Sequence, residues 1–289
     1  MRAATIGTGT PKVAVVGGIH GDEPCGVHAV EQLLADPPAV DEPVKLVVAN
    51  ERAYERGERY VDTDLNRSFP GDPDADAHEA RLAAELADEL EDCLTLAHHS
   101  TQSYDEPFAV VDEPNGLMRT LVPKLPVEAI VTTGQFIQGR LFSAVRSIEV
   151  ECGYQGSDAA ADNAAEITEA FLRATGVLAE KDGTDLGGQG AGETIGVDRP
   201  EDGSDGDGRT TTGTDLPVYR LSRSIDKNER TEYELLASNF ERVDAGSAYA
   251  AVDGDPVVAE EPFYPVLMSE NGYERIFGYA AQRVDTIDG

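Results

Sequence analysis

Short apolar runs and longer amphipathic stretches follow one another along the first 180 residues. The apolar runs predict buried strands, and the stretches with apolar side chains three or four positions apart predict helices packed on them. This alternation indicates an α/β fold with a mixed, mostly parallel sheet flanked by helices. The strands are expected at 13–17, 45–49, 94–98, 108–111, 129–132 and 147–151, and the helices at 25–35, 76–91, 117–124 and 158–178.

The pattern changes after residue 180. Gly, Asp, Ser and Thr crowd the next segment and few apolar side chains could pack there, so an acidic Gly-rich loop or linker is expected over 181–214. Its Asp and Gly residues alternate as in a calcium loop, but no Glu closes the loop at the right offset. A smaller β-rich domain is expected over 215–289, following an α/β domain over 1–180. Its strands are predicted at 216–221, 247–252, 263–268 and 275–283, with one short helical turn within 230–237.

The charge is strongly acidic. The 55 acidic and 23 basic residues give a net charge of −32, and only 5 of the basic residues are lysines. Such a field repels nucleic acid and anionic membranes, so neither is an expected partner. Because the acids are spread along the whole chain, they indicate a salt-adapted (halophilic) protein whose charges are screened at high salt. We therefore expect structure to be lost at low ionic strength.

Location and redox state follow from what the sequence lacks. It has no run of about 18 apolar residues and no basic start followed by an apolar stretch, so neither a spanning helix nor a signal peptide is expected. A cytoplasmic protein is the resulting prediction. Three cysteines, an odd and small number, argue against a disulfide framework, and we expect Cys25, Cys93 and Cys152 to be buried thiols.

A histidine and a glutamate follow the first predicted buried strand, within the stretch Gly17-Gly18-Ile19-His20-Gly21-Asp22-Glu23. The carboxyl ends of strands are where open α/β sheets place ligands. The spacing of His20 and Glu23 lets both side chains reach one divalent ion, and nitrogen and oxygen ligands suit zinc. A solvated loop is the alternative for this pair taken alone.

A zinc site needs at least one more protein ligand. Among the five histidines, His98 and His99 end the predicted strand 94–98, again at the carboxyl edge of the sheet. Side chains alternate along a strand, so only one of the two can face the ion. The pattern leaves open which one.

A polar cluster occupies 62–71 and ends in Pro-Gly, which indicates a rigid loop. Its Asn66 and Arg67 stand side by side. An amide donor beside a guanidinium suits recognition of a carboxylate. A salt-bridged turn is the alternative interpretation.

These motifs together resemble the succinylglutamate desuccinylase/aspartoacylase family of zinc amidohydrolases. The resemblance lies in 17–23, in Asp64-Leu65-Asn66-Arg67, in a strand-terminal histidine and in Glu151-Cys152-Gly153, and it covers roughly 10–180. It implies a zinc carboxypeptidase-like fold, a catalytic domain over 1–180 and one Zn²⁺ per chain.

The family's zinc ligands correspond to His20, Glu23 and His98. Relatives usually show Asp-Leu-His at the third ligand, which places Leu96 where they carry the acid. That acid could support the histidine tautomer in relatives, so its replacement leaves the support of this ligand open.

The resemblance also implies catalytic and substrate-binding roles. Glu151 corresponds to the catalytic glutamate, although Glu149 faces the same side by alternation. Arg59 corresponds to the arginine near the scissile carbonyl, and Asn66 and Arg67 to the residues that hold the substrate carboxylate. Further substrate contacts are expected from a C-terminal tyrosine and from an arginine before the catalytic glutamate, for which the candidates are Tyr273, Arg140 and Arg146.

The predicted reaction is hydrolysis of the amide bond of an N-acyl amino acid, with Glu151 as general base. A metallocarboxypeptidase acting on peptides has the same core and ligand types and stays an alternative. Two other classes are a non-catalytic metal-binding module and a cysteine hydrolase using Cys25 or Cys152. The partner is a small-molecule substrate, and the sequence leaves a homo-oligomer open.

Overall fold

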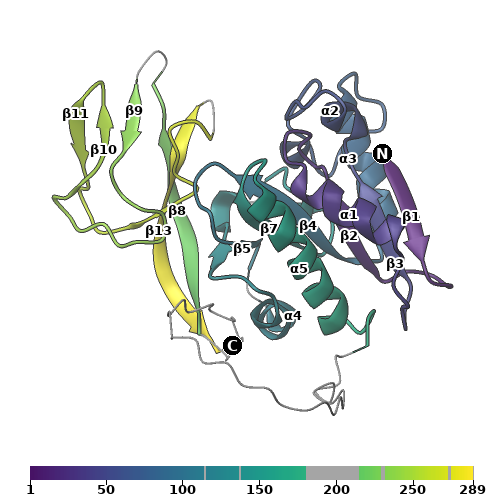
Figure 1. Cartoon of the computed structure of the whole chain (residues 1–289). Helices are drawn as coiled ribbons and strands as arrows, with labels where there is room; N and C mark the ends of the chain where they lie inside the picture. Colours follow the sequence, from purple (N-terminus) through teal and green to yellow (C-terminus); the bar gives the residue numbers. More distant parts are fainter. Residues whose placement is uncertain (114, 137, 180–214, 229–231, 273–274, 289) are drawn as a thin grey trace, which may run out of the picture.

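The computed structural model describes all 289 residues except 114, 137, 180–214, 229–231, 273–274 and 289. A ten-stranded sheet has the order β1-β3-β2-β4-β7-β5-β6-β8-β13-β12, and a separate three-stranded sheet has the order β11-β10-β9 (Figure 1). The strands are β1 Arg2–Ile6, β2 Val13–Gly17, β3 Val44–Val48, β4 Leu94–Thr101, β5 Phe108–Val111, β6 Ile130–Thr132, β7 Ser147–Tyr154, β8 Leu216–Asp226, β9 Tyr233–Leu235, β10 Ala248–Val252, β11 Asp255–Val258, β12 Tyr264–Val266 and β13 Ile276–Ile287.

The helices are mostly those expected from the amphipathic stretches. They are α1 Cys25–Ala35, α2 Glu51–Tyr54, α3 His78–Leu90, α4 Gly116–Leu121 and α5 Asp158–Ala174, with 3-10 turns at Leu65–Arg67, Val122–Lys124, Gly134–Phe136 and Leu141–Ser143. Strands β2 and β5 and helix α1 have the predicted bounds. Strand β4 runs three residues beyond the predicted end at residue 98, and this difference changes the site.

The centre of the large sheet is parallel. β2 pairs in parallel with β3 and β4, and β4 pairs in parallel with β7, whereas β5 runs antiparallel to β7. The mixed sheet flanked by helices confirms the predicted fold class. The carboxyl ends of β2, β4 and β7 therefore meet at one edge, where the candidate ligands were expected.

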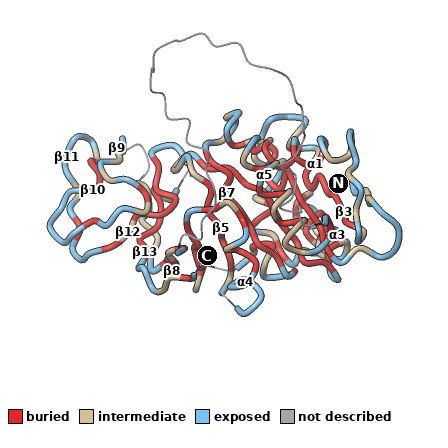
Figure 2. The backbone as a smooth tube through the Cα atoms, turned by 60° about the horizontal axis from the view of Figure 1, so that its bottom comes forward, coloured by how far each residue is buried: buried red, intermediate tan, exposed pale blue. Residues whose placement is uncertain are grey.

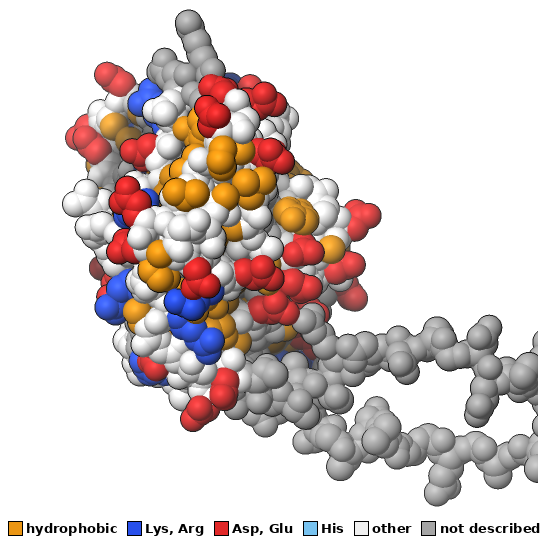
Figure 3. Space-filling model, turned by 90° about the vertical axis from the view of Figure 1, so that its left-hand side faces the viewer, with side chains coloured by type: hydrophobic (Ala, Val, Ile, Leu, Met, Phe, Trp, Pro, Cys, Tyr) orange, Lys and Arg blue, Asp and Glu red, His pale blue; other side chains and the backbone are white. Residues whose placement is uncertain are grey.

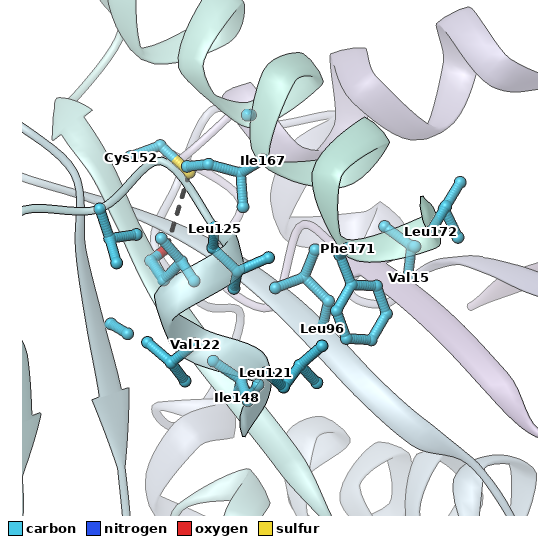
Figure 4. Close-up of a cluster of buried hydrophobic side chains, with 14 of the residues drawn as sticks. Val15, Leu96, Leu121, Val122, Leu125, Ile148, Cys152, Ile167, Phe171 and Leu172 are labelled. Carbon is cyan, nitrogen blue, oxygen red and sulfur yellow. Dashed lines mark hydrogen bonds between the residues drawn. The ribbon is translucent and has the colours of Figure 1, made fainter. Parts of the chain in front are cut away.

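Helices cover both faces of this central region. α1, α4 and α5 pack on one face, where Val15, Leu96 and Ile148 from the strands meet Phe171 and Leu172 of α5 (Figure 4). α3 packs on the other face through Leu82, Leu86 and Leu90, among other residues. Every residue of β2 and β4 is buried, and Figure 2 shows β7 mostly in red, so these strands are covered on both sides. Alternation along each strand therefore assigns every side chain to one of two different layers.

The C-terminal part adds strands to the large sheet as well as forming its own. β8 pairs in parallel with β6, and the long β13 pairs with β8. The small sheet then lies beyond β8 and β13 (Figure 1). The β-rich character was predicted, but the helical turn within 230–237 is wrong, because Tyr233–Leu235 forms β9 and pairs with β10. The strands β1 and β11 and the short helix α2 were not predicted.

Two expectations fall on residues outside the described part of the chain, namely the linker over 181–214 and its calcium-loop alternative. Among the described residues, no helix is both long enough and apolar enough to cross a membrane.

Candidate metal centre and active site

A sharp turn after β2 delivers the first two candidate ligands. Gly18 has φ +69°, a conformation that L side chains rarely adopt, and a Cβ at Gly17 would lie 2.2 Å from the backbone of Gly26 in α1. The glycines thus let the chain reverse closely against α1. His20 and Glu23 leave this turn buried, with 3% and 4% of their surface exposed.

The third candidate ligand comes from β4 and is His99. Nδ1 of His20 lies 2.9 Å from Oε1 of Glu23, and Nδ1 of His99 lies 3.0 Å from Oε2 of the same carboxylate. The two Nδ1 atoms are 3.3 Å apart. Ligands of a tetrahedral zinc at about 2.0–2.1 Å are separated by about 3.3 Å, so this donor set fits such an ion. Among the described residues, these three form the group that could hold a metal.

The expectation that His98 is the third ligand is wrong. Its Nε2 lies 2.7 Å from Oγ1 of Thr168 in α5, and its Nδ1 lies 3.3 Å from Sγ of Cys152. His98 therefore points toward the layer that contains Cys152, labelled in Figure 4, on the other face of the sheet from His99. Because β4 continues to Thr101, both histidines lie inside the strand and alternation separates them.

Asp64 supports His20 from behind, a role that the sequence analysis missed. Its Oδ1 lies 3.0 Å from Nε2 of His20, the ring nitrogen turned away from the candidate metal position. A carboxylate on the outer nitrogen fixes the tautomer and ring orientation of a metal-binding histidine. Asp64 also accepts from Nε and Nη2 of Arg59 at 3.3 and 3.2 Å. The signal was present, since Asp64 opens the Asp-Leu-Asn-Arg motif.

Arg59 lies at the edge of the candidate metal position. Besides its contacts with Asp64, its Nη1 donates to Oε1 of Glu23 at 3.0 Å. Its side chain is 28% exposed, so the guanidinium is braced by two carboxylates while it still reaches the cavity. This geometry agrees with a cation positioned beside the reacting group.

A buried carboxylate on α3 shapes the loop that carries Asp64. Glu79 accepts the backbone N–H groups of Val61, Asp62 and Thr63 and the side-chain amide of Asn50. These hydrogen bonds lower the pKa of Glu79, although burial acts in the opposite direction. No role was predicted for Glu79 from the sequence.

The charged groups of the candidate metal centre shift one another's pKa values. Burial acts to raise the pKa of Glu23, but His20 and His99 outweigh it and hold the carboxyl well below its usual range. Burial acts to lower the pKa of His99, but its hydrogen bond to Glu23 and the nearby acids raise it to about 9. Asp64 likewise has a lowered pKa, because His20, Arg59 and Arg67 outweigh the effect of burial. A cation is therefore strongly favoured among these groups.

The structure separates the roles of Glu149 and Glu151. Both lie on β7 and face the site, but Oε2 of Glu149 accepts from Asn66 at 3.0 Å. Oε2 of Glu151 is buried without a hydrogen-bond partner among the described residues, and Glu151 lines the cavity with His20, Glu23 and His99. Burial raises the pKa of Glu151 to about 7, with the charge of His99 opposing. Such a carboxyl is suited to exchange a proton near neutral pH.

The predicted substrate-binding residues lie in different settings. Asn66 and Arg67 line the cavity, but both ends of the Asn66 amide are engaged, by Glu149 and by the backbone N–H of Leu141. Arg140 is 6% exposed, lines the same cavity and lies 3.6 Å from Glu149. Tyr273 lies outside the described residues. Thus two arginines, 67 and 140, are placed to meet an anionic group.

The cysteines do not form a nucleophilic site. Cys25 and Cys152 are buried on the α5 face of the sheet. Burial raises the pKa of Cys152 well above its usual value, which disfavours the reactive thiolate. Burial also lowers the pKa of the neighbouring His98 to about 3. The cysteine hydrolase alternative therefore has no support in this geometry.

Comparison with known proteins gives matches of two kinds. Residues 9–105 match the family described as "Succinylglutamate desuccinylase/Aspartoacylase catalytic domain". A probable aspartoacylase of Prochlorococcus marinus subsp. pastoris is 39% identical over 81 residues, which are 27% of this chain and 28% of that protein. The N-acyl-aromatic-L-amino acid amidohydrolase (carboxylate-forming) A of Danio rerio is 30% identical over 145 residues, 41% of this chain and 44% of that protein. These sequence matches thus span less than half of each relative.

Solved structures match over almost the whole chain. Murine aminoacylase 3 superimposes with a TM-score of 0.67 and 20% identity, covering 97% of this chain and 98% of that one. A succinylglutamate desuccinylase/aspartoacylase from Rhodobacter sphaeroides gives 0.69 and 20%, covering 98% and 89%. At these identities the likeness establishes the fold.

Proposed function

Residues 9–105 match the succinylglutamate desuccinylase/aspartoacylase catalytic-domain family, and from this match we propose that the chain is a zinc-dependent hydrolase of N-acyl amino acids. The products would be a carboxylate and a free amino acid. One observation carries the proposal. Three buried donors converge beside a carboxylate oxygen of Glu151 that has no hydrogen-bond partner among the described residues.

His20, Glu23 and His99 would hold the ion. A zinc ion bound there would supply Lewis-acid activation of water and of the amide carbonyl. Glu151 then accepts a proton from the attacking water at its carboxylate and returns it to the leaving amine. The raised pKa of Glu151, about 7, suits both steps near neutral pH.

Arg59 is placed to stabilise negative charge on the reacting oxygen. It is held by Asp64 and Glu23, so little reorganisation is needed when that charge develops. A well-placed donor of this kind is typically worth about 3–4 kcal/mol of transition-state stabilisation.

The arginines of the cavity select the substrate class. Arg67 and Arg140 line the same cavity as Glu151 and would bind the carboxylate of the amino acid. Holding that carboxylate orients the amide and converts binding energy into rate. The Danio rerio relative is named as an N-acyl-aromatic-L-amino acid amidohydrolase, which supports this class of substrate. The acyl group and the amino-acid side chain stay to be identified by assay.

The test is metal content and hydrolysis by protein purified in high salt. N-acetyl-aspartate, N-succinyl-glutamate, N-acyl aromatic amino acids and peptides with a free carboxyl end would be assayed before and after chelation. We expect about one zinc per chain. We also expect deacylation that is lost on chelation and restored by zinc. Cleavage of the peptides alone would identify a carboxypeptidase. A folded sample with neither metal nor activity would refute the proposal.

A further inference from the structure

In the candidate metal site, the outer ring nitrogen of His99 lacks a hydrogen-bond acceptor among the described residues. If Nδ1 binds the ion, the ring proton must reside on Nε2, and a buried N–H needs an acceptor. Nε2 of His99 has no hydrogen-bond partner among the described residues. The equivalent nitrogen of His20 has Asp64 at 3.0 Å. The two histidine ligands are therefore supported unequally as the structure stands.

Glu149 faces that nitrogen. Its Oε2 lies 3.8 Å from Nε2 of His99, and its Oε1 is buried with no hydrogen-bond partner among the described residues. A buried donor and a buried acceptor oxygen thus lie on the same side of the sheet, both incompletely satisfied. Closing the gap by about 1 Å would form an ordinary hydrogen bond.

The strand register shows how the carboxylate of Glu149 comes to lie near His99. Ala97 lies two residues before His99 on the same face of β4, and its methyl group offers no acceptor to the ring. Ala97 is paired with Glu149 across the β4–β7 ladder. Paired residues on adjacent strands share a face and lie about 4.8 Å apart. The acid that β4 lacks is therefore supplied by the neighbouring strand at the same height.

We propose that Glu149 is a positioning residue for the metal site: its carboxylate accepts the Nε2–H of His99 and so fixes the tautomer and ring orientation required for metal binding at Nδ1. This inference rests on the proposed function. The same carboxylate holds the Asn66 amide at 3.0 Å and faces Arg140 at 3.6 Å. Glu149 thereby connects the candidate ligand His99 to Asn66 and Arg140 of the substrate cavity, whereas Glu151 acts as the general base.

The experiment measures zinc affinity of the full chain by chelator competition in high salt, together with the absorption spectrum of the cobalt form. Glu149→Ala should weaken zinc binding by about 10–100-fold, the usual cost of losing an outer partner of a ligand. Adding Ala97→Asp to Glu149→Ala returns a carboxylate to β4 and should recover most of the affinity. Glu151→Gln is the matched control on the same strand and face, and its zinc affinity should stay within about twofold of the wild type because Glu151 supports no ligand.

The outcomes separate this inference from the proposed function. A wild-type chain that binds no zinc would remove the proposed function itself. Zinc binding by wild type and Glu149→Ala with equal affinity, or no recovery on adding Ala97→Asp, would overturn the role of Glu149 alone. If Glu149→Ala does not fold, the isosteric Glu149→Gln decides. We then expect about 3–10-fold weaker binding and a shifted cobalt spectrum, since the amide still accepts but carries no charge. An unchanged Glu149→Gln would overturn the proposal.

Discussion

The two faces of the β4–β7 pair differ although the same two strands build both. On one face His99, Glu149 and Glu151 crowd together with buried atoms that lack hydrogen-bond partners among the described residues. On the other face His98 is satisfied on both ring nitrogens, by Thr168 and Cys152, within an apolar layer. Both faces are buried, so burial alone does not mark the site.

The difference lies in how the polar groups are satisfied. Native interiors pair nearly all their buried polar atoms, and exceptions call for an explanation. On the α5 face burial lowers the pKa of His98 to about 3, so this paired histidine is neutral. On the site face the pKa values of His99 and Glu151 are about 9 and about 7, shifts typical of functional groups. Because the pKa of His98 is shifted as well, a shifted pKa alone does not separate the two faces, and the incomplete pairing of His99, Glu149 and Glu151 is what marks the candidate site.

The largest effect should come from replacing each of the two histidines of β4 in turn. His99→Ala removes a ligand and should reduce bound zinc from about one per chain to nearly none, with hydrolysis at background. His98→Ala, its neighbour on the same strand, should keep the metal and most of the activity. Metal analysis of both variants checks this pair. Loss of zinc from His98→Ala with retention in His99→Ala would reverse the assignment of the faces.

Glu151→Gln should separate chemistry from metal binding on the site face. Removing a general base costs typically 10²–10⁴-fold, and we expect kcat to fall by about that factor. Bound zinc should stay at the wild-type level. The measurement is kcat alongside metal content, and an unchanged kcat would take Glu151 out of the reaction.

On the α5 face, His98→Ala should act on stability. It removes the contacts with Thr168 and Cys152, and a buried group left without its partner costs about 1–3 kcal/mol in free energy of unfolding. Urea unfolding at constant high salt measures this. The exposed histidine of α1 offers a control, since His28→Ala should change stability by less than about 0.5 kcal/mol. Equal stability of the two variants would mean that the buried pairing contributes nothing.

The smallest expected effect is a shift with pH. Burial raises the pKa of Glu151 to about 7, and the base must be deprotonated to act. Therefore kcat/KM should rise with pH, and a bound dication, which favours the carboxylate, should place this limb at or below about pH 7. A pH profile at constant salt tests it, with Glu151→Gln expected to lose the limb. A rate that falls as pH rises through this range would contradict the assignment.

Much of the fold follows from local pattern in the sequence. Apolar runs located the central strands, and the helical spacing of Leu82, Leu86 and Leu90 located α3, because these side chains face a packed layer. Strands β1 and β11 escaped, since they lie at sheet edges with mostly exposed side chains. The prediction of a helical turn within 230–237 was wrong because pairing with β10 overrides a weak local preference for helix.

At the candidate site, an error of one residue in the predicted ligand changes the face of the sheet on which it lies. His20 and Glu23 could be located because glycines mark their turn, but the third ligand was placed one position early. A shift of one residue moves a side chain to the other face of the sheet. Alternate residues of a strand share a face. Leu94 and Leu96 lie in the layer under α5, so His98, two residues further, lies on the same side. The support from Asp64 and Glu149 could not be read from spacing, because it depends on contacts across 44 residues of chain and between neighbouring strands.

The central claim is that a metal binds on the His99 face. Anomalous diffraction at the zinc edge, from crystals grown with the protein's own metal, tests this most directly. We predict one peak between Nδ1 of His20, the carboxylate of Glu23 and Nδ1 of His99. A peak beside His98 and Cys152, or a fully folded chain with no peak at all, would contradict the account.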